Sequence, residues 1–307
     1  MDTISPLVTQ IRPYGKAAID EAADIIRAGG CVAVPTETVY GLAADATNGD
    51  AVARIYAAKG RPSFNPLIVH VPDLMAAERI AVFSDQARAL ARQYWPGPLT
   101  LVLPVRPDSG IAALVMAGLP TIALRVPAHP AMQDLLQGCG RPLAAPSANA
   151  SGTISPTRAA HVMKSLGGRI PLIIDAGPTQ QGLESTIVAV SDSGLRLLRP
   201  GPIDLALPMT SGGSIEAPGQ LASHYAPTKP VRLNAASAAP GEWLIGFGTM
   251  ACDANLSPAA DLVEAAARLF DLLHQADASA APAIAVAPIP ETGLGLAIND
   301  RLRRAAA

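Results

Sequence analysis

The sequence predicts an α/β fold with a central sheet. Short apolar runs that suit buried strands alternate with segments of helical periodicity, as at residues 31–34, 67–71 and 99–103, and this alternation is typical of α/β proteins. Half of the 307 residues are hydrophobic, 16% are charged and 4% are aromatic, which indicates a globular chain and not a disordered one. The length is enough for one large or two ordinary domains.

The net charge, the cysteine spacing and the hydrophobic runs argue against several classes of protein. The formal net charge is -2, so the whole chain is not expected to be a general binder of polyanions. Cys31, Cys139 and Cys252 lie far apart without CxxC spacing, which predicts neither a zinc site nor a disulfide framework. Residues 1–14 lack the pattern of a signal peptide, and the longest uncharged runs, such as 109–124, are interrupted by Gly and Pro. We therefore expect a soluble cytoplasmic protein with no membrane contact.

The first elements follow from periodicity and from capping residues. Apolar side chains at helical spacing predict a helix over residues 19–26, and Gly29-Gly30 supplies the left-handed residue that ends it. The short apolar run 31–34 predicts a buried strand. Asp50 is predicted to cap a helix over residues 51–58.

The middle of the chain continues the alternation. Ser84 is predicted to cap a helix that stops at Trp95-Pro96-Gly97-Pro98, because proline cannot continue a helix. Another helix is expected from Thr157 onward, and Asp192-Ser193-Gly194 is expected to turn one strand into the next. Further strands are predicted over residues 67–71, 99–103, 121–126, 142–145 and 195–199.

The composition changes after Gly201. Residues 208–230 are rich in Gly, Ser and Pro with little periodicity, which predicts an interdomain linker. Beyond it, Ser257-Pro258 is expected to start a long amphipathic helix that reaches about Ala276. Strands over 243–247 and 283–287 and a helix over 294–304 complete the prediction of a small C-terminal α/β domain.

Polar clusters follow several of the predicted strands, where α/β proteins usually line a ligand crevice. The first is PTETVYGL, residues 35–42, in which hydroxyl and carboxylate groups crowd against Gly41, where a turn is expected. A polar turn capped by Thr36 or Thr38 is the alternative. Glu37 is a candidate acid or base, but at a strand end it is equally a structural hydrogen-bond acceptor.

The second cluster is Lys59, Arg61 and Asn65, at the end of a predicted helix. These residues can hold a triphosphate: arginine through paired N–H donors, lysine as a point charge and asparagine as a neutral donor. Basic residues near a helix end can also merely complement the helix dipole. His70, inside an apolar strand, would in isolation be a core histidine.

Three more clusters complete the set. Arg125 lies in an apolar strand and is costly to bury without an anion, which is either an internal carboxylate or that of a substrate. The run APSANASG, residues 145–152, has the chemistry of a phosphate-binding loop but matches neither a Walker A motif nor GxGxxG; a serine-rich capping loop is the alternative. GLESTIV, residues 182–188, and Arg199 mark two further strand ends.

Seven motifs in register resemble one family. PTETVYGL, KGRPxxNPLIVH, WPGPLTLVL, LRVPAHP, APSANASG, ESTIV and LRPG occur in that order between about residues 10 and 205. They are similar to those of the YrdC-like family of L-threonylcarbamoyladenylate synthases, in the longer form with an added C-terminal domain. The resemblance implies a YrdC-like twisted mixed sheet with flanking helices over 1–208, a linker over the active site at 209–230, and a small Rossmann-like α/β domain over 231–307.

The resemblance also implies an activity and a set of site residues. The family combines L-threonine, bicarbonate or CO2, and ATP with Mg2+ into threonylcarbamoyl-AMP and pyrophosphate, and a separate complex then transfers the threonylcarbamoyl group to tRNA. No covalent nucleophile or acid–base catalyst is assigned. The implied threonine site comprises Thr38, His70, Arg125, the Ala145 backbone and Ser185. The implied ATP site comprises Lys59, Arg61, Asn65, Thr121, Ser147, Ser155, Arg199 and Tyr225, with Asn149 nearby.

The predicted linker also carries motifs that resemble those of the family. Residues 217–220 and 223–227 resemble the segment that lies over the active site in the long form, but this chain has Gln-Leu-Ala-Ser at 220–223 where basic or aromatic residues are usual. A passive tether is the alternative to gating of the site by the linker, and the C-terminal domain is expected to regulate access to the site.

A carbamoyl-transfer maturation factor is disfavoured as the function because its additional domains are missing. An RNA-binding module is disfavoured by the net charge, although a weak contact with tRNA stays open.

Overall fold

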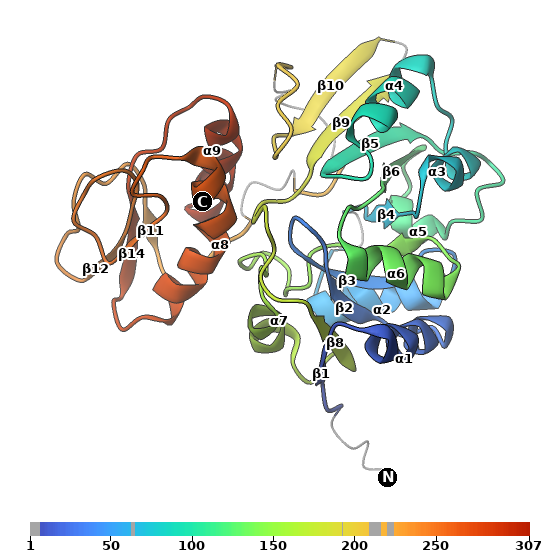
Figure 1. The fold of residues 1–307 in the computed structure, drawn as a ribbon, viewed down its shortest axis with the longest axis horizontal. Coiled ribbons are helices and arrows are strands. Elements are labelled where there is room, and N and C mark those ends of the chain that lie inside the picture. The colour runs from blue at the N-terminus through green and yellow to red at the C-terminus, as the bar shows by residue number, and fades with distance from the viewer. Residues whose placement is uncertain (1–6, 63–64, 192, 209–215, 220–223) are drawn as a thin grey trace.

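Ten strands form one mixed sheet, called the large sheet below. The computed structural model describes residues 7–62, 65–191, 193–208, 216–219 and 224–307 (Figure 1). The strand order is β1-β8-β2-β3-β7-β4-β6-β5-β9-β10. The strands are β1 (Gln10–Pro13), β2 (Val32–Pro35), β3 (Tyr40–Asp45), β4 (Ile68–His70), β5 (Leu99–Pro104), β6 (Thr121–Arg125), β7 (Leu143–Ala144), β8 (Leu172–Asp175), β9 (Thr186–Ser191) and β10 (Gly194–Arg199).

Helices flank the large sheet, as predicted. They are α1 (Lys16–Arg27), α2 (Gly49–Lys59), α3 (Leu74–Ile80), α4 (Asp85–Tyr94), α5 (Ala113–Met116), α6 (Pro130–Cys139) and α7 (Ala159–Leu166). Parallel pairs such as β4 with β6 and antiparallel pairs such as β2 with β3 occur in the same sheet. Side chains alternate faces along β5, so Leu101 and Leu103 enter one apolar cluster and Val102 enters another. The sheet is therefore buried on both faces there.

A second, four-stranded sheet lies in the C-terminal part of the chain. Its order is β11-β14-β12-β13, and its recorded pairs are parallel. Its elements are β11 (Val231–Arg232), β12 (Glu242–Gly246), β13 (Ala254–Asn255), α8 (Leu262–Ala278), β14 (Ala283–Val286) and α9 (Leu294–Ala305). We call this set the C-terminal unit. Its helices α8 and α9 lie on the side of the small sheet that faces the large sheet (Figure 1).

Most predicted elements are confirmed, with three corrections of detail. Asn48, not Asp50, caps α2, because its side chain accepts hydrogen bonds from the first backbone N–H groups. Helix α8 begins at Leu262 behind Asp261 as its cap, not at Ser257. Ser257 instead accepts a hydrogen bond from the Asp261 N–H and so fixes the loop before the helix.

The third correction concerns Gly41, which lies inside β3 and not in a turn. It pairs with Val34 of β2, so the chain reverses at residues 36–39. A Cβ added at Gly41 would lie 3.3 Å from Ala145 Cβ. Glycine is therefore favoured there by the close approach of the loop after β7, and not by an unusual backbone angle.

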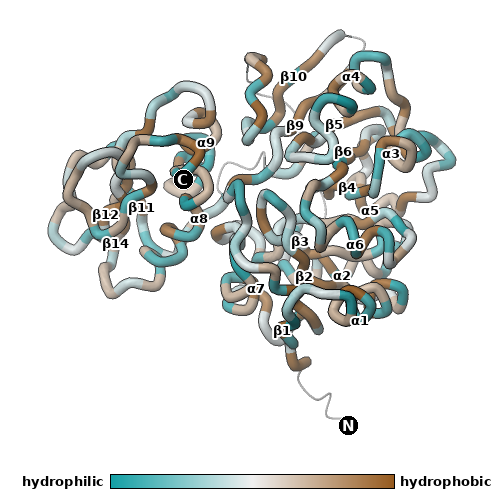
Figure 2. The backbone as a smooth tube through the Cα atoms, in the orientation of Figure 1, coloured by the Kyte–Doolittle hydropathy of each residue, from teal (hydrophilic) through white to brown (hydrophobic). Residues whose placement is uncertain are grey.

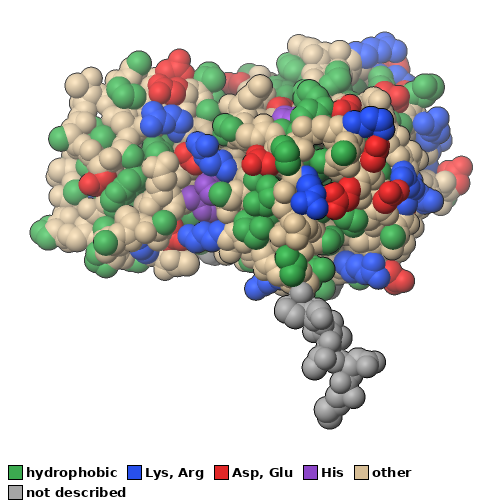
Figure 3. All heavy atoms as spheres, turned by 60° about the horizontal axis from the view of Figure 1, so that its bottom comes forward, with side chains coloured by type: hydrophobic (Ala, Val, Ile, Leu, Met, Phe, Trp, Pro, Cys, Tyr) green, Lys and Arg blue, Asp and Glu red, His purple; other side chains and the backbone are tan. Residues whose placement is uncertain are grey.

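Hydrophobic stretches run through the elements of both parts of the chain (Figure 2). Within the described residues, no helix is long and apolar enough to cross a membrane. Lysine and arginine are interspersed with acidic side chains on the face in Figure 3, without a large patch of one sign. Parts of the predicted linker, 209–215 and 220–223, and Asp192 of the predicted turn lie outside the described residues.

Candidate functional site

A cavity opens where several strands of the large sheet end. His70 and Arg125 end the parallel strands β4 and β6 and are paired in register, so their side chains belong to one edge of the sheet. The other walls come from the β2–β3 turn, the loop after β7, the segment before β9 and the end of β10. The lining residues are Thr36, Thr38, Val39, Gly41, Arg61, Ile68, His70, Arg125, Ala145, Pro146, Ser147, Glu184, Ser185, Arg199, Pro218, Gly219, His224 and Tyr225.

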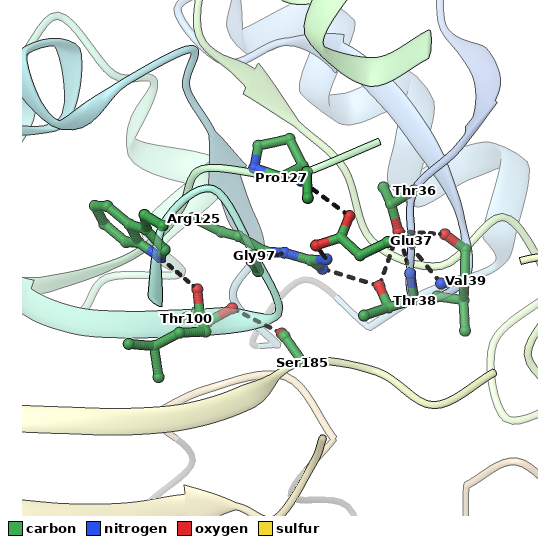
Figure 4. Close-up of polar contacts among 12 residues, drawn as sticks. Thr36, Glu37, Thr38, Val39, Gly97, Thr100, Arg125, Pro127 and Ser185 are labelled. Atoms are coloured by element: carbon green, nitrogen blue, oxygen red, sulfur yellow. Dashed lines mark hydrogen bonds and ion pairs between the residues drawn. The ribbon is translucent and has the colours of Figure 1, made fainter. Parts of the chain in front are cut away.

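Arg125 is paired with an internal carboxylate, which resolves the alternative left open by the sequence. Its Nη2 donates to Glu37 Oε1 at 2.7 Å and its Nη1 to Thr38 Oγ1 at 3.0 Å (Figure 4). Nε donates to the Gly97 carbonyl at 3.2 Å. Burial alone would raise the pKa of Glu37, but the charge of Arg125 and the hydrogen bonds, including one from the Ala128 N–H, lower it. Glu37 is therefore an ionised partner that orients the arginine.

His70 offers a neutral ring to the cavity. Burial, followed by the charge of Arg125, lowers the pKa of His70 to about 3. Its buried Nδ1 has no hydrogen-bond partner within the described part of the chain. Buried polar atoms in folded proteins nearly always have a partner. The unpaired nitrogen therefore indicates a place for a ligand or a water molecule.

Ser185 and Arg199 form the opposite wall. Arg199 donates from Nη2 to Ser185 Oγ and from Nε to the Ser185 carbonyl, each at 3.0 Å. Thr100 Oγ1 lies 2.7 Å from Ser185 Oγ (Figure 4). Thr100 supports the site from within β5 and was not identified from the sequence, where it is one hydroxyl in an apolar run.

Lys59 is buried behind the cavity wall. Its Nζ donates to the carbonyls of Ser147 at 2.6 Å and Asn149 at 2.5 Å. Burial, and then the charge of Arg61, holds the pKa of Lys59 well below its usual value. In the structure Lys59 therefore holds the 145–152 loop and does not line the cavity, whereas Arg61 does.

Three other predicted ATP residues lie outside the cavity lining. Asn65 is buried, and neither atom of its side-chain amide has a partner among the described residues. Thr121 is at the opposite end of β6 from Arg125 but on the same face, since side chains alternate along a strand. Ser155 is buried and donates to Glu184 Oε1. Their contact with ATP stays a prediction.

A segment before the C-terminal unit covers the cavity. Tyr225 is buried, and its hydroxyl has no hydrogen-bond partner within the described residues. Gly219 has a φ of 84°, and a Cβ there would lie 2.9 Å from the Tyr225 hydroxyl and 3.0 Å from Arg199 Cδ. The cavity is about 50 Å³, whereas sites for drug-sized ligands span roughly 300–1,000 Å³. With the covering residues in place, the cavity is therefore smaller than a site for a drug-sized ligand.

Comparison with known proteins identifies the family. A family model described as "Telomere recombination" (Sua5_yciO_yrdC) matches residues 24–201, and one described as the C-terminal domain of threonylcarbamoyl-AMP synthase matches residues 183–307. A threonylcarbamoyl-AMP synthase of Bacillus subtilis is 41% identical, covering 94% of this chain and 92% of its own. The chain belongs to the threonylcarbamoyl-AMP synthase family.

A solved structure extends the likeness to three dimensions. The crystal structure of Sua5 from Pyrococcus abyssi complexed with L-threonine is 36% identical and has a TM-score of 0.88, covering 98% of each chain. A synthase from the same organism is 39% identical over 92% of each chain. The long form of the threonylcarbamoyl-AMP synthase family, expected from the motifs, is thereby confirmed.

The structure brings together most of the residues that the motifs implied for this family. All five predicted threonine residues line the cavity: Thr38, His70, Arg125, Ala145 and Ser185. Four predicted ATP residues do so as well: Arg61, Ser147, Arg199 and Tyr225. Glu184 also lines it and was not assigned from the sequence, because in ESTIV it reads as one charge before an apolar strand.

Proposed function

We infer that this chain is a threonylcarbamoyl-AMP synthase, which joins L-threonine, bicarbonate or CO2, and ATP into threonylcarbamoyl-AMP and pyrophosphate. One observation carries the inference: in a chain of this family, the cationic groups of Arg61, Arg125 and Arg199 converge with small hydroxyl groups on one covered cavity. The product is the first intermediate in the threonylcarbamoyladenosine modification of tRNA. A separate transfer complex would consume it.

We assign the threonine half of the site to the wall around Arg125. An arginine has five N–H donors, and three donor bonds to Glu37, Thr38 and Gly97 fix the plane of the guanidinium. Its remaining N–H groups suit the substrate carboxylate. The hydroxyls of Thr38 and Ser185 and the neutral ring of His70 suit the amino and hydroxyl groups of threonine. A site built to hydrogen-bond a substrate hydroxyl rejects analogues that lack it.

We assign the nucleotide half to Arg61, Arg199 and Ser147. Arginine recognises phosphate oxygens through paired N–H groups. Burial is the main cause that lowers the pKa of Arg61 to about 10, so its charge is retained at neutral pH. Lys59 would act indirectly, because it holds the carbonyls of Ser147 and Asn149 and so sets the shape of the loop.

The reaction then needs positioning more than side-chain chemistry. The neutral amine of threonine attacks the carbon of CO2 and loses a proton to solvent. The resulting carbamate oxygen attacks the α-phosphorus of ATP while pyrophosphate leaves. Holding two reactants in line removes much of the entropic barrier, and arginine side chains stabilise the charge on the phosphoryl oxygens. No covalent bond to the protein is required.

Magnesium fits this scheme as part of the substrate. Among the described residues, no group of three or more His, Cys, Asp and Glu side chains is arranged to hold a metal ion. Most of the polar side chains of the cavity walls are arginine and hydroxyl groups, which suit phosphate oxygens. We therefore propose that Mg2+ arrives on the phosphates of ATP, where it would neutralise charge. A cytoplasmic location and at most a weak contact with tRNA complete the proposal.

Pyrophosphate release tests the proposed function. The purified protein is incubated with Mg2+ and ATP, and L-threonine and bicarbonate are omitted in turn. A synthase releases pyrophosphate only when both co-substrates are present. Release that ignores threonine would instead indicate a nucleotide hydrolase. No release, combined with salt-dependent binding of tRNA, would favour an RNA-binding module.

A further inference from the structure

Arg301 reaches the catalytic cavity wall from the C-terminal unit. It lies on α9, and its side chain is fully buried. Nε donates to Glu184 Oε2 at 2.9 Å, and Nη1 donates to the Pro200 carbonyl at 2.8 Å and to Asp300 Oδ2 at 2.9 Å. The guanidinium carbon also lies 5.5 Å from the centre of the Tyr225 ring. One side chain of the C-terminal unit thus contacts both Glu184 and the residue that covers the cavity.

Glu184 connects this contact to the proposed ATP site. It lines the cavity and precedes Ser185, whose hydroxyl and carbonyl accept hydrogen bonds from Arg199. Its second carboxylate oxygen accepts the hydrogen bond from Ser155. Glu184 therefore lies between the arginine of α9 and two residues on the nucleotide side: Arg199, which is assigned to ATP, and Ser155, whose contact with ATP is a prediction.

The segment just before Glu184 packs tightly against the C-terminal unit. Gly182 has a φ of 67°, and a Cβ there would lie 2.4 Å from the Ala266 carbonyl oxygen and 2.6 Å from Ala267 Cα of α8. Leu183 is buried in the same apolar cluster as α8 and α9. The segment that carries Glu184 is therefore held by backbone contact as well as by charge.

The negative charge of Glu184 needs a counter-charge, because Glu184 is buried beside the proposed triphosphate site. An unpaired carboxylate beside the proposed triphosphate would repel it, and a buried carboxylate without a partner is strongly unfavourable. Arg199 donates two hydrogen bonds to Ser185 and acts on Glu184 through its charge. We propose, on the basis of the proposed function, that Arg301 is a positioning residue of the ATP site: it neutralises and orients Glu184, which leaves Arg199 for the nucleotide.

The ionisation of Glu184 makes the proposed role of Arg301 measurable as a pH dependence of ATP binding. Burial alone would raise the pKa of Glu184, but the charges of Arg301 and Arg199 and the hydrogen bonds lower it. The other titratable groups near it are His224 and Tyr225, while Asp300 accepts a hydrogen bond from Arg301. His224 has a pKa of about 3, chiefly because of burial, and the pKa of Tyr225 is raised above its usual value, so neither titrates near pH 7. Without Arg301, the pKa of Glu184 should rise.

The test compares Mg-ATP binding in four proteins: the wild type, Arg301→Met, the double variant Glu184→Gln with Arg301→Met, and Arg303→Met as the control. Arg303 lies on the same helix but is exposed and paired with Glu291. Calorimetric titration gives the Kd, pyrophosphate assays give the KM for ATP and for threonine, and thermal unfolding shows whether each variant is folded.

Arg301→Met is expected to raise the Kd and KM for ATP roughly tenfold or more, because an unpaired buried charge is left beside the phosphates. The double variant removes both charges and should return the Kd to within about threefold of the wild type. The ratio of the variant Kd to the wild-type Kd should fall as the pH is lowered from 8.5 to 6.0, since protonation of Glu184 removes the repulsion. Arg303→Met should bind as the wild type does.

Two results would overturn the proposal: unchanged ATP binding in Arg301→Met, or a double variant that is no better than the single one at any pH. If Arg301→Met does not fold, the double variant decides alone, because a Kd raised tenfold in it would show that charge balance is not the cause. If the wild type releases no pyrophosphate, the proposed function fails, while the comparison of Kd values still decides the role of Arg301.

Discussion

Glu37 and Arg125 form a buried ion pair, with 2.7 Å between Glu37 Oε1 and Arg125 Nη2. The two residues lie 88 positions apart in the sequence and meet at the end of β6. The guanidinium of Arg125 already has a counter-charge. The remaining N–H groups of Arg125 would therefore recognise a substrate carboxylate by their direction and not by net charge alone. This geometry favours selection of one amino acid in one orientation.

Arg125→Met should weaken threonine binding selectively. The KM for threonine is expected to rise at least tenfold, because a charged hydrogen-bond partner is lost, while the Kd for Mg-ATP alone should change less than about threefold. Glu37 would remain buried without its charged partner, which should also reduce the free energy of unfolding by about 3–5 kcal/mol. Steady-state kinetics and urea unfolding measure both effects. Arg88→Met, which removes a surface ion pair with Glu78, is the control, and equal effects of both variants on threonine would contradict the assignment.

Lys59→Met should loosen the 145–152 loop. The lysine donates hydrogen bonds to two carbonyls of this loop. Loss of these hydrogen bonds leaves the buried carbonyl oxygens without this donor. Hydrogen exchange of the loop amides should become faster, and the KM for ATP should rise several-fold. Lys16→Met, which alters an exposed lysine paired with Asp20, should leave both unchanged. Loop protection that is identical in the Lys59 variant and the wild type would show that Lys59 does not hold the loop.

Acid should destabilise the folded protein before its carboxylates titrate. Burial lowers the pKa of His70, His161 and His224 to about 3 and that of His274 to about 4. The unfolded chain, with a histidine pKa near 6.5, binds more protons below that pH, so stability is fully present above pH 6.5 and is lost as the pH falls toward the folded values. Between pH 7.5 and 5.0 we expect a loss of about 1–2 kcal/mol for each of these histidines.

Urea unfolding at the two pH values measures this loss. His274 stacks on His161 with 3.8 Å between ring centroids, at the contact between α7 and α8. His274→Asn should therefore reduce the pH dependence while the remaining histidines sustain most of it. A free energy of unfolding that is equal at pH 7.5 and 5.0 would show that these rings are protonated in the folded state.

Gly182→Ala should disturb the contact between the large sheet and the C-terminal unit. Its Cβ would meet the backbone of α8 at 2.4 Å, and backbone cannot move aside as a side chain can. Gly140→Ala is the matched control, because Gly140 also has a positive φ, 63°, but has nothing within 4 Å of its Cβ. The control should cost only about 1–2 kcal/mol for its backbone conformation. Equal losses of stability in the two variants would mean that α8 does not pack closely on Gly182.

Much of the site could be predicted because its chemistry is local. Hydroxyl and cationic residues that follow apolar strands in PTETVYGL, LRVP and APSANASG do line one cavity. The pairing of Arg125 with Glu37 could not be decided, since both an internal and a substrate carboxylate satisfy a buried arginine. Asn48 was missed because Asp50 is an equally good capping residue two positions later.

The role of Arg301 has no local signal. It stands near the end of a helix beside Arg303 and Arg304, where basic residues commonly complement the helix dipole. Only the docking of α9 on the Glu184 segment distinguishes it from its exposed neighbour Arg303. The prediction that the C-terminal domain regulates access to the site stays a prediction. The contact of Arg301 with Glu184 gives this domain a second proposed role, which is electrostatic.

Mass spectrometry of the product shows whether this chain makes threonylcarbamoyl-AMP. The protein is incubated with Mg-ATP, L-threonine and 13C-bicarbonate, and the nucleotide fraction is analysed at once. We expect threonylcarbamoyl-AMP one mass unit heavier than with unlabelled bicarbonate, formed in equal amount to pyrophosphate and absent when threonine is left out. AMP or ADP without a labelled carbamoyl adduct would contradict it.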